Sequence, residues 1–223
     1  GALLSPQLLQ LSGVGPAPLL KRHNMAVLHH LPAVGQHLKD HLGIDHTLLV
    51  NQPSLNQVLR PIWGKIRVGL EYIFKQTGPL SMSVNQGGGF VKSETSLTAP
   101  DFQLYFSPLS YTAAPHGKRP MMSPDPFAAV RLGFNPCKST SEGTVKIKSP
   151  DAFVAPKFFG NYLSTDYDCQ MMIKGMRLMR EFTETPALKN VVTKEQSPGP
   201  DVQSDAEMMA FARENAGTVF HQC

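Results

Sequence analysis

Apolar residues recur at helical spacing in several parts of the chain. In residues 54–75 they stand three or four positions apart, which predicts a helix. These residues are Val58, Ile62, Ile66, Leu70 and Ile73. Pro61 lies inside this segment and is expected to kink or divide the helix. Further helices are predicted over residues 164–182 and over residues 204–215, where Ser204 and Glu207 form a capping-box pattern.

Two of the predicted helices have an expected buried face. Residues 5–12 read as a short helix because Ser5 is a favourable N-cap, Pro6 suits the first helical position and Gly13 ends the segment. Its expected buried residues are Leu8, Leu9 and Leu11. The helix at 164–182 carries a methionine stripe, for which core packing is the default role. The stripe consists of Met171, Met172, Met176 and Met179.

The middle of the chain shows strand signals instead. Short runs at residues 89–91, 102–106, 128–134 and 144–148 are bounded by Pro, Gly, Ser and Asp. Because no helix long enough for a crossover separates them, we expect an antiparallel sheet. Residues 194–203, rich in Pro, Gly and Ser, read as a loop. The predicted fold class is α+β, an antiparallel sheet flanked by helices.

Composition excludes several classes of protein. With 223 residues, 41% of them hydrophobic, the chain can bury a core. Its 21 basic and 17 acidic residues are interspersed, so no nucleic-acid partner is expected. No apolar run reaches the ~20 residues of a membrane span, so no transmembrane segment is expected. The three cysteines are widely spaced, which favours a reducing, cytoplasmic location.

Eight segments resemble one enzyme family in the correct order along the chain. Residues 1–16 read GALLSPQLLQLSGVGP and residues 31–42 read LPAVGQHLKDHL. TGPL, GGFV, PDFQL, SEGTVKIKS and NYLS follow, and residues 217–221 read GTVFH. Together these segments resemble the glucose-methanol-choline (GMC) oxidoreductases, with Ala33 and His37 as departures from the family's usual Gly and Asn.

The resemblance implies a division of the chain and a cofactor. Residues 1–43 would be part of an FAD-binding domain, residues 44–215 the substrate-binding domain, and residues 216–223 a return to the FAD domain at the active site. FAD is the implied cofactor. Gly1, Ala2 and Ser5 are the candidate cofactor-binding residues, because small residues let a backbone approach a ligand and the helix start at Ser5 presents amide groups.

His221 is the candidate catalytic residue, because the segment GTVFH is similar to the family element that ends in the active-site histidine. An imidazole with an ordinary pKa of ~6.5 can accept the hydroxyl proton of an alcohol near neutral pH while hydride leaves for the flavin. A lone histidine after apolar residues is more often structural, so its place in the family pattern carries the assignment.

Four residues are candidates for the substrate pocket. Val219 and Phe220 adjoin His221. Tyr105 lies on the face of its predicted strand opposite Phe102, and a structural tyrosine with a satisfied hydroxyl is an equally good reading. Gln86 places a neutral amide where choline-oxidising relatives carry a carboxylate, which favours an uncharged primary alcohol; the alternative is a plain polar residue at a strand start.

A metal site is not expected. His37 and His41 have helical i, i+4 spacing, with Asp40 between them. Gly35 and Gly43 bracket the segment, however, and no general-base Glu stands between the histidines. The spacing therefore lacks the context of a metal-binding helix.

Three functions remain open from the sequence. The first is an FAD-dependent dehydrogenase or oxidase that converts a small primary alcohol to an aldehyde, with the electron acceptor undetermined. The second is a hydroxynitrile lyase on the same fold, and the third is a non-catalytic binding module. The chain contains no GxGxxG turn, starts without Met and ends just after His221. We therefore expect an internal fragment that is inactive alone, with a second active-site residue beyond Cys223.

Overall fold

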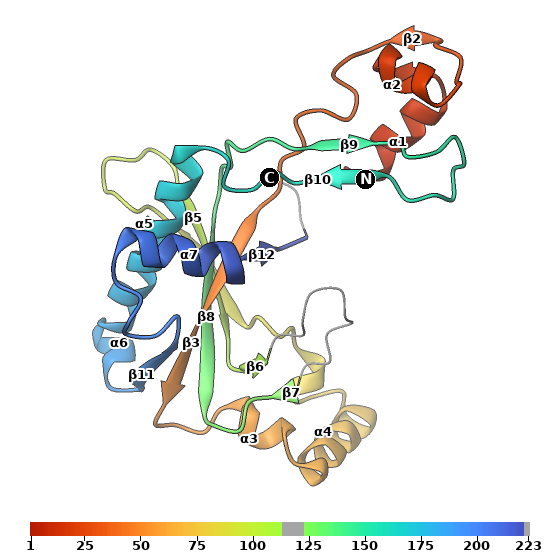
Figure 1. Ribbon diagram of the computed structural model, residues 1–223. Coiled ribbons are helices and arrows are strands. Elements are labelled where there is room, and N and C mark those ends of the chain that lie inside the picture. The colour runs from red at the N-terminus through yellow and green to blue at the C-terminus, as the bar shows by residue number, and fades with distance from the viewer. Residues whose placement is uncertain (113–122, 221–223) are drawn as a thin grey trace. The chain divides into compact units, whose positions relative to one another are not determined.

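The computed structural model describes residues 1–112 and 123–220 (Figure 1). The chain forms two compact units. Unit 1 consists of Gly1–Leu42, Lys138–Met171 and Thr218–Cys223, and unit 2 of Gly43–Cys137 and Met172–Gly217. Lys138–Met171, which was predicted from the sequence to lie in the substrate-binding domain, packs in unit 1. The assignment of flavin and substrate roles to the two units stays a prediction.

Unit 1 is built from short elements. They are α1 (Leu4–Leu11), β1 (Val14–Gly15), α2 (Ala17–Arg22), β2 (His29–His30), β9 (Thr144–Lys146) and β10 (Lys157–Phe159). Strands β1 and β2 pair in parallel, and β9 pairs antiparallel with β10. A small apolar core holds Leu19, Leu20 and Ile147. The run at 144–148 was expected in the main sheet, and this expectation was wrong because its backbone partner is β10.

Helix α1 differs from its prediction in two ways. It begins at Leu4, and Leu3 rather than Ser5 is the N-cap, without a side-chain hydrogen bond. Its expected buried face is also wrong, because Leu8 is 67% exposed and Leu9 is exposed as well. The residues that this helix buries are Gln7 and Gln10.

Unit 2 is organised around an antiparallel sheet with the strand order β11–β3–β8–β5–β4. The strands are β3 (Leu42–Val50), β4 (Gly87–Val91), β5 (Phe102–Ser107), β8 (Ala129–Pro136) and β11 (Val192–Ser197). Every pairing in this order is antiparallel, which confirms the predicted fold class. The short strands β6 (Tyr111–Thr112) and β7 (Ser123–Pro124) form a separate antiparallel pair.

Two strands of this sheet were not predicted. Strand β3 is largely buried along its length, so its sequence lacks the alternation that marks a half-exposed strand. Strand β11 overlaps the expected loop at 194–203. It lies at the sheet edge, where one neighbour and two register shifts allow the polar sequence VTKEQS.

The helices of unit 2 follow the sequence signals closely. Pro61 divides the predicted helix into α3 (Leu55–Leu59) and α4 (Ile62–Lys75). Helix α7 (Asp205–Asn215) has the expected capping box of Ser204 and Glu207. The remaining short elements are η1 (Pro79–Ser81), α6 (Pro186–Lys189) and, where the chain leaves unit 2, β12 (Gly217–Thr218).

Helix α5 (Asp166–Thr183) carries the predicted methionine stripe, whose four members are all buried. Gly175 of this helix lies against the ring of Phe134, since an added Cβ would come within 2.1 Å of it. The close approach of α5 to β8 therefore requires glycine at this position. Within the described ranges, no helix combines the length and apolarity needed to cross a membrane.

Candidate functional site

The segment that leads to His221 is held by hydrogen bonds within unit 1. The amide of Val219 donates to the carbonyl oxygen of His41 at 3.2 Å, and the amide of Phe220 donates to Thr218 Oγ1 at 3.1 Å. Phe220 has a φ of 60°, which is uncommon for an aromatic residue, and its side chain is exposed. The predicted catalytic residue, His221, lies outside the described residues.

The side chain of Asp40 also holds this segment, through a hydrogen bond from the side chain of Thr218. Its Oδ2 atom accepts a hydrogen bond from the Thr218 hydroxyl at 2.5 Å and another from the Tyr162 hydroxyl at 2.6 Å. Hydrogen bonds to an ionised carboxylate are shorter and stronger than neutral ones. Sequence reasoning missed this cluster, although Asp40 and Thr218 both lie in segments that resemble the GMC family, because nothing local connects residues so far apart.

The candidate cofactor-binding residues stand at the start of α1. Gly1, Ala2 and Ser5 are exposed, and an added Cβ at Gly1 would meet no atom within 4 Å. They therefore leave room for a ligand such as FAD. The amide of Ser5 is not free as expected, because it donates to the Gly1 carbonyl at 2.9 Å, as does the amide of Leu4 at 3.1 Å.

A buried glutamine holds α1 in place. The side-chain nitrogen of Gln10, Nε2, donates to the carbonyls of Val34 and Val145 at 3.2 and 3.0 Å. The side-chain oxygen, Oε1, accepts a hydrogen bond from the Ile147 backbone amide at 2.9 Å. Gly35 makes this approach possible, because a Cβ there would lie 2.1 Å from the Val145 oxygen. The Gln10 amide thus connects the helix that follows Gly1 to the segment around β9.

Gln86 directly precedes strand β4 of unit 2, and Tyr105 lies on the neighbouring strand β5. The Gln86 amide donates to the Phe106 carbonyl at 2.9 Å, and Tyr105 pairs with Gly88 across β4 and β5. The side chain of Gln86 is exposed, whereas Tyr105 is half-buried. The structure thus brings these two predicted pocket residues close together in unit 2, and places Val219 and Phe220 in unit 1.

Tyr105 belongs to a polar cluster on β3, β5 and β8. Its hydroxyl donates to the Phe134 carbonyl at 3.4 Å, and an added Cβ at Gly133 would overlap the Tyr105 ring and the Asp45 carboxylate. Asp45 also pairs with Arg131 at 3.2 Å. Burial raises the pKa of Tyr105, and the neighbouring Asp45 carboxylate raises it further. The phenol is therefore neutral and serves as a hydrogen-bond donor.

Burial also governs the other carboxylates of interest. It raises the pKa of Asp45, and Arg131 only partly opposes this effect. For Asp168, at the start of α5, burial acts in the same direction, but hydrogen bonds from Ser141 and Thr140 outweigh it and hold the pKa below the usual value. The Asp168 carboxylate accepts hydrogen bonds from the backbone amides of Thr140 and Ser141 at 2.9 and 2.7 Å. This ionised residue anchors the residues before β9 to α5.

The segment that contains His37 and His41, considered above as a metal site, is engaged in contacts with other residues of the chain. His37 forms an ion pair with Glu142, which also lies 3.4 Å from the Lys39 ammonium group, and His41 is buried. Over residues 1–112 and 123–220, no group of three His, Cys, Asp or Glu side chains is placed to hold a metal ion.

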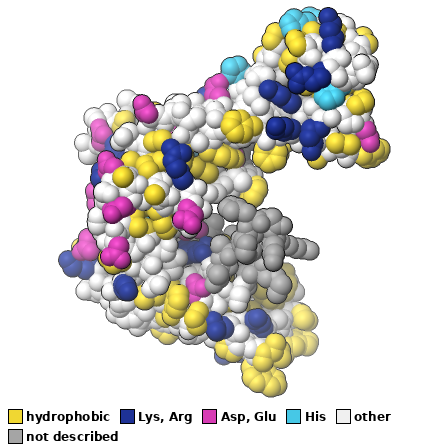
Figure 2. Space-filling model, in the orientation of Figure 1, with side chains coloured by type: hydrophobic (Ala, Val, Ile, Leu, Met, Phe, Trp, Pro, Cys, Tyr) yellow, Lys and Arg dark blue, Asp and Glu magenta, His cyan; other side chains and the backbone are white. Residues whose placement is uncertain are grey.

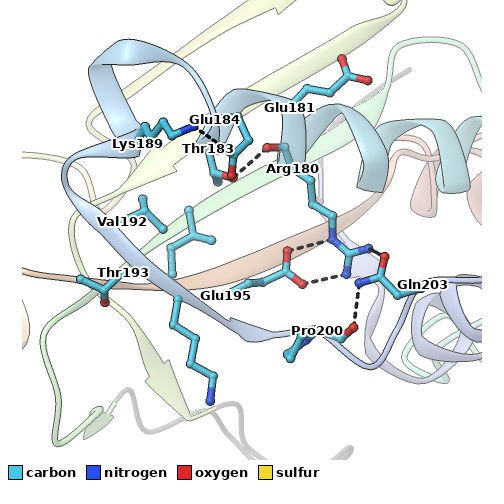
Figure 3. A pocket seen from close by; sticks show the side chains of 12 residues that line it. Arg180, Glu181, Thr183, Glu184, Lys189, Val192, Thr193, Glu195, Pro200 and Gln203 are labelled. Carbon is cyan, nitrogen blue, oxygen red and sulfur yellow. Dashed lines mark hydrogen bonds and ion pairs between the residues drawn. The ribbon is translucent and has the colours of Figure 1, made fainter.

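A pocket of about 610 Å³ lies in unit 2 beside β11 and contains none of the predicted site residues (Figure 3). Arg180 projects across it and contacts both carboxylate oxygens of Glu195, at 2.8 and 3.0 Å. Lys189 pairs with Glu184 at 3.2 Å. Four of the charged residues that line this pocket are thus paired with one another.

Comparison with solved structures defines the class of the fold. A formate oxidase matches with a TM-score of 0.85 at 24% identity, over 99% of this chain and 42% of that one. Another structure, from Aspergillus oryzae, concerns FAD modification in formate oxidase and has a TM-score of 0.84. The chain therefore has the fold of the matching part of formate oxidase.

Sequence comparison gives the family. Residues 139–223 match the family model described as GMC oxidoreductase. The chain is 37% identical to an oxygen-dependent choline dehydrogenase of Pseudomonas syringae over 99% of its own length, and 36% identical to that of Proteus mirabilis over 100%. It spans about 38% of the length of these curated relatives. The chain belongs to the GMC oxidoreductase family.

This assignment confirms the GMC oxidoreductase family predicted from the sequence and supports FAD as the cofactor of that family. The described residues that could adjoin the cofactor are Gly1, Ala2 and Ser5, which leave open space. The roles of these residues, and of the predicted pocket residues, stay predictions.

Proposed function

We propose that this chain is part of an enzyme that oxidises a primary alcohol to an aldehyde, with hydride transfer to FAD. The names of its choline dehydrogenase relatives support an alcohol substrate, since choline is a primary alcohol. The observation that carries the proposal is the Asp40–Thr218 hydrogen bond, which tethers the backbone three residues before His221. A fixed backbone is what a catalytic histidine requires, because a general base acts only within hydrogen-bond reach of its proton.

The chemistry divides between cofactor and protein. FAD, when bound, supplies the hydride acceptor. His221 takes the proton from the substrate hydroxyl, so that negative charge develops on oxygen as hydride leaves. Asp40 and Thr218 hold the backbone that carries His221. Val219 and Phe220 shape the space beside the reacting carbon.

Anaerobic flavin reduction by alcohols tests this function. With the FAD-loaded enzyme, a primary alcohol should bleach the oxidised flavin and yield one aldehyde per flavin reduced. A lyase on the same fold would cleave a hydroxynitrile and leave the flavin oxidised. Binding of the alcohol without either reaction would support a binding module and contradict the proposal.

The neutral amide of Gln86 motivates the finer proposal of an uncharged substrate. The probes are choline and its uncharged isostere, 3,3-dimethylbutan-1-ol, which differ in charge at almost equal volume. We expect a higher kcat/KM for the uncharged alcohol. Gln86→Glu should shift the ratio towards choline, because a carboxylate can neutralise the ammonium group, whereas Gln86→Asn should not. Preference of the unaltered enzyme for choline would contradict an uncharged substrate.

A further inference from the structure

Helix α4 exposes its apolar face instead of burying it. Val68 is its only buried residue. Besides Tyr72, six large apolar side chains on the helix are exposed, with Trp63 at 77% and Phe74 at 79%. They are Ile62, Trp63, Ile66, Leu70, Ile73 and Phe74. Monomeric soluble proteins rarely leave such a contiguous apolar patch uncovered.

The exposed residues form one continuous stripe. At 100° per residue, all six fall within an arc of about 120°, and Val68 lies on the opposite side. Lys65 borders one edge of the stripe and Arg67 the other. Three more exposed apolar residues lie within or just after η1, at Leu80, Met82 and Val84. Figure 2 shows hydrophobic side chains gathered over the part of unit 2 where Figure 1 places α4, with basic side chains nearby.

The charges around the stripe indicate which partner covers it. Residues 55–84 contain four basic side chains and a single acidic one, Glu71. The basic residues are Arg60, Lys65, Arg67 and Lys75. An apolar face with Trp and Phe, bordered by Lys and Arg, is the pattern of a helix that lies in a lipid interface. Two copies of α4 packed face to face would instead bring their basic edges together.

We propose that α4 and residues 80–84 bind the surface of an anionic lipid bilayer. The stripe enters the boundary between headgroups and acyl chains, with the helix parallel to the membrane plane. Lys65 and Arg67 extend their ammonium and guanidinium groups to lipid phosphates while their aliphatic stems cover apolar surface. This surface is independent of the proposed reaction.

Trp63 makes the proposal directly measurable, because it is the only tryptophan of the chain. On addition of phosphatidylcholine vesicles that contain phosphatidylserine, the fluorescence of Trp63 should shift to the blue and become protected from a soluble quencher. The protein should sediment with these vesicles, and less with phosphatidylcholine alone. High salt should weaken the binding, because it screens the attraction of Lys65 and Arg67 to phosphate.

Variants that retain Trp63, the fluorescent reporter, test whether the α4 stripe is the surface that binds the vesicles. Ile66→Ser with Phe74→Ser should weaken vesicle binding about tenfold or more, because two inserted side chains are lost. Lys65→Glu with Arg67→Glu should weaken binding to the anionic vesicles by a similar factor. The matched control, Leu28→Ser with Phe153→Ser, removes two exposed apolar side chains from unit 1 and should bind normally.

Several outcomes would overturn the proposal. They are an unshifted Trp63 spectrum with no sedimentation, or equal losses in the α4 variants and the control. A concentration-dependent dimer that the Ile66→Ser, Phe74→Ser variant abolishes, without any vesicle binding, would assign the stripe to a second copy. A blue shift of Trp63 on addition of another protein, with no shift on addition of vesicles, would likewise contradict a lipid partner.

Discussion

The Asp40 carboxylate and the Thr218 hydroxyl meet at 2.5 Å although 178 positions separate them in the sequence. Thr218 stands three residues before His221, and the neighbouring amide of Val219 is held by the His41 carbonyl. One short segment, Asp40–His41, thus fixes both a side chain and the backbone of the strand end that leads to the predicted catalytic residue. This makes Asp40 and Thr218 positioning residues.

Thr218→Val should slow alcohol oxidation by the FAD-loaded enzyme. Valine keeps the shape of threonine but can neither donate to Asp40 nor accept from the Phe220 amide, so the following backbone loses two of its three hydrogen bonds. Small displacements of a catalytic group cost up to about a hundredfold in rate, and we expect a loss of about tenfold to a hundredfold in kcat. Thr218→Ser keeps the donor and should retain most activity.

The control measurements for Thr218 are FAD content and the pH profile of kcat. A positioning role predicts normal FAD content and an altered dependence on the ionisation that we assign to His221. If Thr218→Val oxidised alcohols at the normal rate with an unchanged pH profile, the hydrogen bond to Asp40 would be structural only.

Gln10→Leu should destabilise the fold. The substitution leaves the Val145 carbonyl and the Ile147 amide without their partner in a buried site. An unsatisfied buried backbone group costs about 1–3 kcal/mol, so we expect a loss of roughly 2–4 kcal/mol in the free energy of unfolding. Urea denaturation measures it. Leu8→Ala on the same helix is the control and should change stability by less than about 0.5 kcal/mol, because Leu8 is exposed.

Local signals in the sequence located most helices and the central strands. The capping box of Ser204 and the break at Pro61 depend on residues a few positions apart, so the sequence displays them directly. Strand β3 was missed because a strand buried on both faces shows no alternation. The exposed leucines of α1 were misjudged because hydrophobicity alone does not reveal that Gln10 has three buried hydrogen-bond partners.

The candidate site was predictable only where it resembles a family. The GTVFH segment pointed to His221, and the Leu-Pro-Ala-Val-Gly element contained Asp40 and His41, yet nothing local joined the two segments. Contacts over such sequence distances follow from the packing of unit 1. The polar cluster around Tyr105 also depends on contacts between distant parts of the sequence, since Asp45 lies on strand β3 and Arg131 on strand β8.

Glu195 should make the stability of unit 2 sensitive to acid. Burial by itself would raise its pKa, but His46 and Arg180 outweigh burial and lower the pKa to about 2 from 4.5. Ionised Glu195 therefore stabilises the fold above about pH 4.5, and this contribution is lost as the pH falls towards 2. Its full size is on the order of 3 kcal/mol.

Glu195→Gln tests this expectation through urea unfolding at several pH values. The variant should be less stable than the unaltered protein at pH 7, and the difference should shrink as the pH falls below about 4.5. Glu184→Gln provides the control, because its ion pair with Lys189 is exposed and should contribute little. A stability gap for Glu195→Gln that stayed constant with pH would show that its charge does not matter.

The 223-residue chain should not retain one equivalent of FAD. It contains no GxGxxG turn, and the amides at the start of α1 already donate to Gly1. The purified chain should be colourless, and gel filtration after incubation with FAD should separate protein from flavin. Flavin absorbance that co-elutes at one equivalent would show that these residues suffice to bind the cofactor.

His221→Ala in the FAD-loaded enzyme should lower the rate of flavin reduction by alcohol. Loss of one general base costs about 10²- to 10⁴-fold, or roughly 3–5 kcal/mol of transition-state stabilisation, and substrate affinity should change much less. Because the Asp40–Thr218 hydrogen bond does not involve the imidazole, FAD content should stay normal. The effect should also exceed that of Thr218→Val, which misplaces the base without removing it. Undiminished flavin reduction by His221→Ala would mean that another group accepts the hydroxyl proton.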